Sequence, residues 1–313
     1  MSLLCPRFPQ RPALVLDGGE VLSYSDLRQA VQAFKPHWRS RELAFLLLDN
    51  DLGSLLAYLS ALEAGAVPLL LGAGLPQHAL RSLLDRYQPE SVWAPVSRQS
   101  GLPDFDTVLS EGDGCLLRRR QPVRPAAAGL HPDLALLLAT SGSTGTPKLV
   151  RLSESNLLSN ADSIAQYLLL DEHDRGITTL PFNYSFGLSV INSHLRVGAS
   201  VVMTRWMFPY IDFMSLVALA AGVLNTWKRF VVPAVTPVLL NVSMIVAAWQ
   251  GAPWFAGMGI EPIYAMAAGV MVGGVLQLAV QIPALARIGV LPRIGLAWSA
   301  LRAAWQDAGV RNI

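Results

Sequence analysis

The chain has 313 residues, of which 52% are hydrophobic and only 15% are charged, and its formal net charge is +2. Soluble domains usually carry about 25% charged residues, so the composition argues against a uniformly soluble protein. The small net charge gives no indication of a nucleic-acid partner. The two cysteines, Cys5 and Cys115, lack metal-ligand or redox spacing and are interpreted as reduced thiols.

Residues 1 to about 204 alternate between strand-like and helix-like segments. The segments Ala13–Leu16 and Glu20–Leu22 flank a turn sequence and predict a hairpin. Continuous apolar runs, typical of strands covered on both faces, alternate with segments of helical spacing; the runs are Leu43–Leu48 and Val67–Leu71, and the helical segments are Leu52–Ala64 and Ala79–Tyr87. This alternation predicts an α/β fold with a largely parallel sheet.

The stretch Ser100–Ala128 has no clear periodicity and contains several prolines and the run Arg118-Arg119-Arg120. We interpret it as a surface loop, and the arginine run as a solvated face rather than a site.

A predicted strand, Leu134–Ala139, leads directly into a loop rich in glycine and hydroxyl groups. The loop reads Thr140-Ser141-Gly142-Ser143-Thr144-Gly145-Thr146-Pro147-Lys148. Glycines let the backbone approach a ligand closely, successive N–H groups can form an anion-binding nest, and the hydroxyls and Lys148 add donors and positive charge. The loop is not a Walker A sequence, because Pro147 precedes the lysine and Leu149 follows it. The pattern predicts a polyphosphate site, and the alternative is a flexible turn.

This loop resembles the phosphate-binding loop of the adenylate-forming superfamily, which includes acyl-CoA synthetases and peptide-synthetase adenylation domains. The resemblance implies that Thr140 to Thr146 and Lys148 contact ATP, with magnesium implied by the family. A second motif, Leu180–Leu188, is similar to the family's segment that precedes the helix walling the acyl pocket. It implies that Tyr184, Phe186 and Gly187 belong to the substrate pocket of an unknown carboxylate. The alternative for this motif is a simple turn between strand and helix.

Three later motifs of that family are missing from this sequence after Thr204: the aromatic-Gly-x-Thr-Glu, the Thr-Gly-Asp and the C-terminal catalytic lysine. Adenylation requires carboxylate, α-phosphate and positive charge to meet in one closed site. We therefore assign no catalytic residue and no metal ligand, and we expect little or no adenylation.

The rest of the chain, residues 205–313, is dominated by apolar stretches. Phe208–Leu224 has one charge, Asp212, whereas Phe230–Trp249 and Ile263–Ala286 have none. A bilayer-spanning helix needs about 17–25 apolar residues. The sequence predicts about three transmembrane helices, and the alternative is a set of buried helices in a soluble core.

The loop charges predict an orientation that conflicts with the N-terminal part. Lys228 and Arg229 lie between the first and second expected spans, and Arg287, Arg293 and Arg302 follow the third. By the positive-inside rule these regions are cytoplasmic. The first span must then begin on the opposite side, so residues 1–204 would lie on the non-cytoplasmic side of the membrane. The start of the chain lacks the pattern of a signal peptide, and a site for ATP implies the cytoplasm.

The C-terminal stretch is similar to the MurJ/MviN lipid II flippase family. The resemblance rests on runs such as Ser215-Leu216-Val217-Ala218-Leu219 and Pro233-Ala234-Val235-Thr236-Pro237-Val238-Leu239-Leu240-Asn241, and it extends from about Arg205 to Ile313. It implies three internal helices of a larger inner-membrane transporter of a lipid-linked peptidoglycan precursor.

We therefore expect two joined family segments: residues 1–204 from an adenylate-forming enzyme and residues 205–313 from a flippase, joined near Met203–Trp206. Such a join is expected of a fused or mis-assembled gene. The N-terminal part implies ATP-dependent activation of a carboxylate. The alternative function is lipid II transport in the bacterial inner membrane, with the bilayer and a lipid-linked precursor as partners. We expect neither activity to survive the truncation of its family domain.

Overall fold

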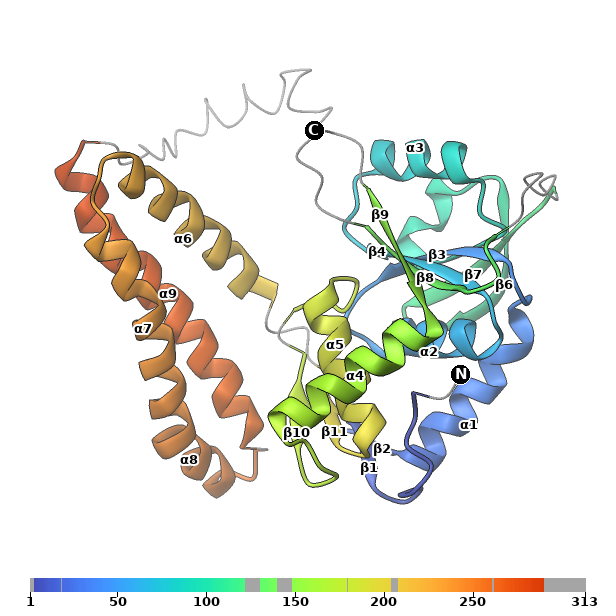
Figure 1. Ribbon diagram of the computed structural model, residues 1–313, viewed down its shortest axis with the longest axis horizontal. Helices are drawn as coiled ribbons and strands as arrows, with labels where there is room; N and C mark the ends of the chain where they lie inside the picture. Colours follow the sequence, from blue (N-terminus) through green and yellow to red (C-terminus); the bar gives the residue numbers. More distant parts are fainter. Residues whose placement is uncertain are drawn as a thin grey trace. The chain divides into compact units, whose positions relative to one another are not determined.

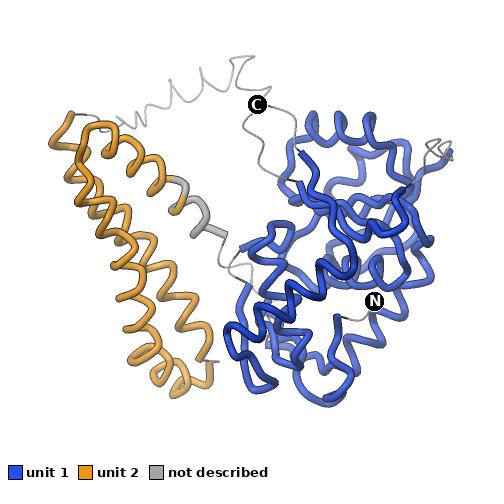
Figure 2. The backbone as a smooth tube through the Cα atoms, viewed as in Figure 1, with its two compact units in different colours: residues 1–206 blue, residues 207–313 orange. Residues whose placement is uncertain are grey.

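The computed structural model divides into two compact units, an N-terminal unit, Met1–Trp206, and a C-terminal unit, Met207–Ile313 (Figure 2). The residues that the structure describes are 3–17, 19–121, 130–139, 148–178, 180–203, 208–260 and 262–289.

The larger sheet of the N-terminal unit has, within the described residues, seven strands in the order β6-β7-β5-β3-β4-β8-β9. Its four central strands run parallel, and antiparallel pairs flank them on both sides. This arrangement confirms the predicted α/β class. The strands are β3 (Leu43–Leu48), β4 (Val67–Gly72), β5 (Ser91–Pro95), β6 (Phe105–Glu111), β7 (Gly114–Arg119), β8 (Leu134–Ala139) and β9 (Leu149–Ser153).

Helices cover both faces of this sheet (Figure 1). One apolar cluster joins the sheet to the first two helices and the fifth, and a second cluster joins the opposite face to the third helix. The continuous apolar runs of β3 and β4 follow from this two-sided burial. The helices are α1 (Tyr24–Phe34), α2 (Leu52–Glu63), α3 (Gln77–Tyr87), α4 (Glu154–Leu168) and α5 (Ser185–Val197).

A smaller sheet has, in the described part of the chain, the order β10-β11-β1-β2. The predicted hairpin is confirmed as the antiparallel pair β1 (Pro12–Val15) and β2 (Val21–Ser23). On its other side β1 pairs in parallel with β11 (Ser200–Val202), which pairs in turn with β10 (Arg175–Ile177). The start of the unit is therefore held to its last strand.

The prediction of a surface loop over residues 100–128 is wrong in its central part, because β6 and β7 form a hairpin there at the sheet edge. Cys115, Leu116 and Leu117 are buried there. The arginines are also less solvated than expected: Arg118 donates to the His37 carbonyl and Arg119 to the Pro89 carbonyl. The short apolar run was obscured by the flanking arginines, whose stems cover the sheet edge while their heads bond to carbonyl groups.

The C-terminal unit consists of helices: α6 (Phe208–Thr226), α7 (Val231–Val246), α8 (Ala252–Gly257) and α9 (Ile263–Arg287). Among the described residues, two helical stretches are long and apolar enough to cross a membrane, Val231–Gly257 and Ile263–Arg287, with mean hydropathies of 2.0 and 1.9. The first expected span corresponds to α6, of which Leu216–Thr226 is a shorter apolar helix. The helical class of this region is confirmed, with two membrane-length helices in the described residues where we expected about three.

Helix α7 packs closely on α9 through small residues. A Cβ atom added to Gly273 would lie 2.6 Å from Cδ1 of Leu240, and one added to Gly269 would lie 2.5 Å from the Cβ of Ala247, in the π-helical turn that directly follows α7. The Ser243 hydroxyl also donates to the Gly269 carbonyl at 2.6 Å. The Gly-x-x-x-Gly pattern therefore serves helix packing.

Candidate functional site

The predicted phosphate-binding loop connects β8 to β9. Of the residues predicted to contact ATP, Thr140 to Thr146 lie outside the described residues, and Lys148 is described and exposed. Residue Ala139 at the end of β8 is paired with Leu149 at the start of β9, so both ends of the loop meet at one place. That place is the carboxyl end of β8, a parallel strand of the sheet, where α/β proteins commonly bind ligands.

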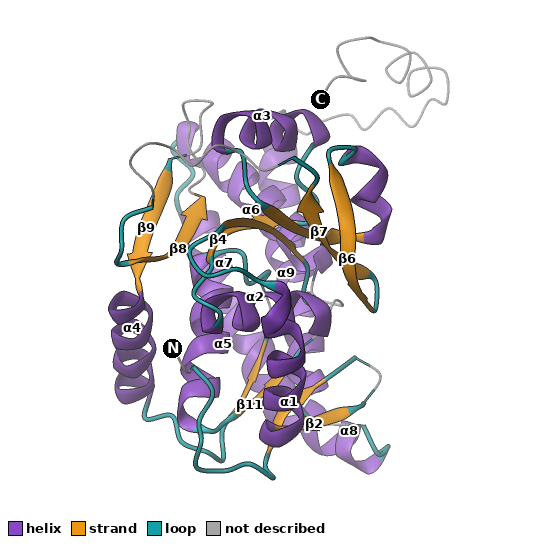
Figure 3. Cartoon of the chain, turned by 90° about the vertical axis from the view of Figure 1, so that its right-hand side faces the viewer, coloured by secondary structure: helices purple, strands orange, loops and turns teal. Residues whose placement is uncertain are grey.

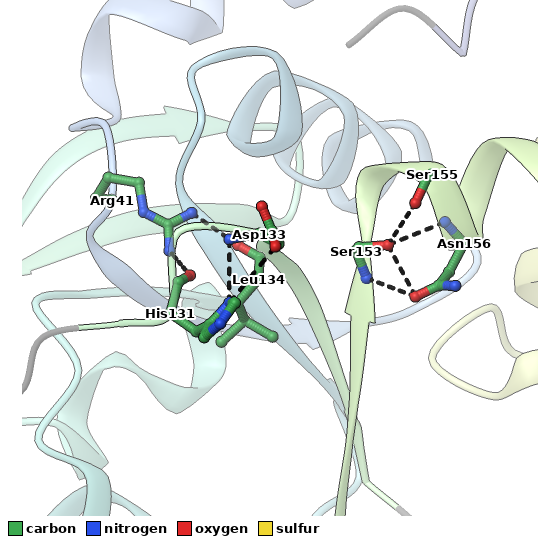
Figure 4. Close-up of polar contacts among 7 residues, drawn as sticks. All are labelled: Arg41, His131, Asp133, Leu134, Ser153, Ser155 and Asn156. Carbon is green, nitrogen blue, oxygen red and sulfur yellow. Dashed lines mark hydrogen bonds and ion pairs between the residues drawn. The ribbon is translucent and has the colours of Figure 1, made fainter.

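The β8–β9 hairpin is anchored at its far end (Figure 4). Arg41 donates through Nη1 to the Leu134 carbonyl at 2.7 Å and through Nη2 to the His131 carbonyl, which fixes the start of β8. Ser153 ends β9 and caps α4: its hydroxyl accepts from the Asn156 N–H at 3.1 Å, and the Asn156 side chain accepts from the Ser153 N–H at 3.0 Å. This capping box starts α4 directly at the strand end. In Figure 3, β9 leads directly into α4.

The second predicted motif forms a turn and the first residues of α5. Phe182 is fully buried, and its ring lies 6.2 Å from that of Tyr58. Tyr184 and Phe186 are exposed to 56% and 58%. Gly187 is buried against the preceding turn, where an added Cβ would lie 2.6 Å from the Pro181 carbonyl oxygen.

The two motifs meet at a cavity of about 680 Å³, called the loop-end cavity below. Its walls come from both ends of the loop, from α4 and from the start of α5. The described lining residues are Leu138, Ala139, Val150, Leu152, Asn156, Leu157, Asn160, Asn183, Tyr184, Ser185, Leu188, Ser189 and Asn192.

Of the three residues expected in a substrate pocket, Tyr184 lines this cavity. Phe186 lines a neighbouring pocket between α4 and α5, together with Tyr167 and His194. Gly187 lies behind the wall and sets the approach of α5 to the turn. The structure brings the ends of the predicted phosphate-binding loop and Tyr184 to one place.

Sequence reasoning missed the asparagines of the described lining, Asn156, Asn160, Asn183 and Asn192. Asn156 and Asn160 have the i, i+4 spacing of one helix face, which is the signal that the sequence offered. The position of Asn192 depends on a hydrogen bond that its side chain accepts from the Tyr58 hydroxyl at 3.2 Å. The sequence does not reveal this long-range contact.

Burial shifts the pKa values of two side chains, Tyr58 behind the cavity wall and His194 on α5. Burial raises the pKa of the Tyr58 phenol, although the hydrogen bond to Asn192 opposes the shift. Burial also lowers the pKa of His194 at the far end of α5, against the opposing effects of its hydrogen bond to the Val190 carbonyl and of Asp174. Both side chains are therefore neutral near pH 7.

Residues 4–238 match the family model of the AMP-binding enzyme, which covers well over half of the chain. The chain belongs to the AMP-binding enzyme family. Surfactin synthase subunit 2 of Bacillus subtilis is 23% identical to it over 176 residues, which are 55% of this chain and 5% of that protein.

The fold of the AMP-binding unit is also that of solved adenylate-forming enzymes. Apo MatB from Rhodopseudomonas palustris aligns with a TM-score of 0.54 at 22% identity over 67% of this chain and 45% of that chain. The o-succinylbenzoate coenzyme A synthetase MenE from Bacillus subtilis, in complex with ATP and magnesium ion, aligns with a TM-score of 0.52 at 22% identity over 68% of this chain and 58% of that chain. At this identity the likeness shows the fold alone.

The C-terminal part of this AMP-binding family member has a different relative. Residues 191–313 match the model of the lipid II flippase MurJ. The lipid II flippase MurJ of Burkholderia cenocepacia is 51% identical over 114 residues, which are 36% of this chain and 21% of that protein. The chain therefore matches the models of two families over two overlapping segments. It spans about half of the solved MatB and MenE chains, 5% of surfactin synthase subunit 2 and about a fifth of that flippase. The two family matches overlap over residues 191–238, and the expected join lies within this overlap.

Proposed function

We propose that the N-terminal unit binds ATP and a carboxylic acid at the loop-end cavity, with the triphosphate on the loop of residues 140–148. The observation that carries this proposal is the meeting of both ends of the loop with the start of α5 at one cavity of about 680 Å³. A cavity of this size suits a small ligand. The enzyme family and the neighbours solved with ATP support a nucleotide as one of the ligands.

The alternation of side chains along β9 suggests how Lys148 contributes. Val150 and Leu152 both line the cavity, and side chains two residues apart face the same side of a strand. By the same alternation, we expect the Lys148 side chain on the cavity side of β9 and the Arg151 side chain on the opposite face. Lys148 would then hold the phosphates as a point charge, and magnesium would be bound with them, as the family implies.

The proposed outcome is binding with little or no adenylation. The sequence after Thr204 has no Thr-Gly-Asp motif and no aromatic-Gly-x-Thr-Glu motif. The groups that the family uses for ribose and magnesium are therefore not found among residues 204–313. Binding contacts without those groups lower the free energy of the ground state and do little for the transition state.

The experiment is a titration of full-length protein in detergent micelles with a fluorescent ATP analogue. Lys148→Ala should weaken binding about tenfold or more, because a charge-assisted hydrogen bond contributes about 1.5–3 kcal/mol. Arg151→Ala, the matched control on the opposite face of β9, should change binding less than about twofold. Equal losses in both variants would contradict the site.

Activity is measured separately by pyrophosphate–ATP exchange that depends on added carboxylic acid. The expected rate lies at the background of protein-free samples. Exchange well above that background would contradict the proposed loss of adenylation.

A second function is supported by the 51% identity to a MurJ protein. We propose that the C-terminal unit inserts into the bacterial inner membrane as a part of a flippase for a lipid-linked peptidoglycan precursor. Alkaline carbonate extraction tests insertion: an inserted protein stays with the membrane pellet, and release into the supernatant would contradict it.

A further inference from the structure

The described wall of the loop-end cavity is polar and carries no charge. It contains four asparagines, two serines and Tyr184 among apolar residues, and no Asp, Glu, Lys, Arg or His is found among its described members. Burying a charged ligand group without a counter-charge is costly. The wall therefore disfavours a second charge on a bound acid, beyond its one carboxylate.

Of the four asparagine side chains in the described wall, three already accept a hydrogen bond through their amide oxygens. The Asn156 oxygen accepts from the Ser153 hydroxyl at 2.8 Å. The Asn160 oxygen accepts from the Ser189 hydroxyl at 3.3 Å, and the Asn192 oxygen accepts from the Tyr58 hydroxyl at 3.2 Å.

Asn183 differs from these three. Its side chain is 8% exposed, and no donor in the described part of the chain reaches its Oδ1, which is shielded from solvent. The amide lies at the carboxyl end of β4, where an added Cβ on Gly72 would be 3.5 Å from Nδ2. A buried acceptor without a donor costs about 1–3 kcal/mol. An isolated amide of this kind in a cavity wall calls for a donor from a ligand.

The amide can present its oxygen to a ligand by a simple rotation. The terminal torsion of asparagine is broad and roughly two-fold, and half a turn exchanges the oxygen and the nitrogen. The side chain that already lines the cavity can therefore turn its acceptor inward without a change in the backbone.

We propose that the loop-end cavity binds a small carboxylic acid whose tail carries an uncharged hydrogen-bond donor, such as a hydroxyl or a primary amide, and that this donor is received by Asn183 Oδ1. This inference rests on the proposed function, in which the cavity is the carboxylate site. A purely alkyl tail leaves Asn183 unpaired, and a second carboxylate brings an uncompensated charge into the wall. Both should bind more weakly than a neutral polar acid of the same size.

The test compares acids of matched shape on the full-length protein in micelles, with a non-hydrolysable ATP analogue present. One pair is 4-hydroxybutanoate and pentanoate, which differ by a hydroxyl against a methyl group. The other pair is succinamate and succinate, which differ by an amide against a carboxylate. Affinities are measured by ligand-observed saturation-transfer NMR.

The hydroxy acid and the amide acid should each bind about tenfold more tightly than their partners. Asn183→Leu should reduce the preference for the hydroxy acid to less than about twofold. Asn160→Leu, the matched control whose oxygen already accepts from Ser189, should keep the preference.

Equal affinities within the pairs in the unmodified protein would overturn the inference without any variant. A preference retained in Asn183→Leu would overturn the assigned acceptor. If the ATP analogue binds and none of the four acids does, the carboxylate inference falls and the nucleotide site stands. If the acids show the preference and the ATP analogue does not bind, the inference stands and the nucleotide part of the proposed function falls.

Discussion

His194 links the stability of the N-terminal unit to pH. Its Nδ1 atom lies 2.8 Å from the Val190 carbonyl, and burial lowers its pKa from the ordinary value of 6.5. As the pH falls below 6.5, the His194 side chain therefore binds a proton in the unfolded chain before it does so in the folded protein. The contribution of neutral His194 to the unfolding free energy is complete above that pH, and it is lost as the pH falls toward the lower pKa of the folded state. Between about pH 7.5 and about pH 5.5, the melting temperature should fall more for the unmodified protein than for His194→Gln. Identical falls would show that His194 does not titrate with folding.

Gly187 is a residue whose role follows from packing. In Gly187→Ala the new Cβ would clash with the carbonyl oxygens of Leu180 and Pro181, at 2.7 and 2.6 Å. We expect a loss of about 1–3 kcal/mol of unfolding free energy, measured by urea unfolding followed by tryptophan fluorescence. Gly74→Ala is the control, because an added Cβ there meets no described atom within 4 Å. Similar losses in both variants would contradict this role.

Two glutamines on one face of α9 should respond differently to replacement by leucine. Gln277 donates to the Thr236 carbonyl at 2.8 Å, whereas Gln281 is fully buried and neither of its amide atoms has a hydrogen-bond partner among the described residues. Gln277→Leu should cost about 1 kcal/mol. Gln281→Leu should be neutral or raise the melting temperature in micelles, because it removes a buried unpaired amide. A large loss in Gln281→Leu would show that this amide has a partner.

At the scale of elements, the contact between α7 and α9 depends on glycine. Gly269→Leu should separate the helices, because even a Cβ at this position would lie 2.5 Å from that of Ala247. The measurement is disulfide formation in a variant with cysteines at Ser243 and Val270 on a cysteine-free background. Efficient crosslinking is expected with Gly269 and little with leucine there. Gly257→Ala, where an added Cβ meets no described atom within 4 Å, should leave crosslinking intact, and unchanged crosslinking with leucine at 269 would contradict the packing.

The elements that the sequence predicted well are those with a local signal. Continuous apolar runs predicted β3 and β4, because both faces of a parallel sheet are covered. The pairing of β1 with β11 joins Leu14 to Val201 and has no local pattern. The hairpin of β6 and β7 was missed because prolines and arginines surround its short apolar core.

The sequence also predicted only those parts of the candidate site that have a local motif. The loop motif and Tyr184 were predicted as site residues from short local sequences, and the structure brings the loop ends and Tyr184 to one cavity. Asn183 gave no comparable signal, because what sets it apart is burial without a hydrogen-bond partner in the described part of the chain. That property depends on the packing of α5 against the sheet, which a linear pattern does not contain.

At the scale of the whole molecule, two family segments with different environments share one chain. The AMP-binding match covers residues 4–238 and the MurJ match covers residues 191–313. The positive charges at Lys228 and Arg229 favour a cytoplasmic loop after the first expected span, which would place the N-terminal unit on the other side of the membrane. A cytoplasmic site for ATP requires the opposite orientation, so the accessibility of Lys228 to a membrane-impermeant amine reagent in intact cells would decide the sidedness.

The central claim is that these two segments form one membrane-bound polypeptide, and the peptide that spans the join tests it most directly. Cleavage before aspartate releases a fragment from Asp174 to Ile211, which carries residues from both sides of the expected join. Mass spectrometry of separated membrane and soluble fractions from cells carrying the gene should find this fragment in the membrane fraction. Peptides from two separate proteins, with the joining fragment missing at adequate coverage, would contradict the fusion.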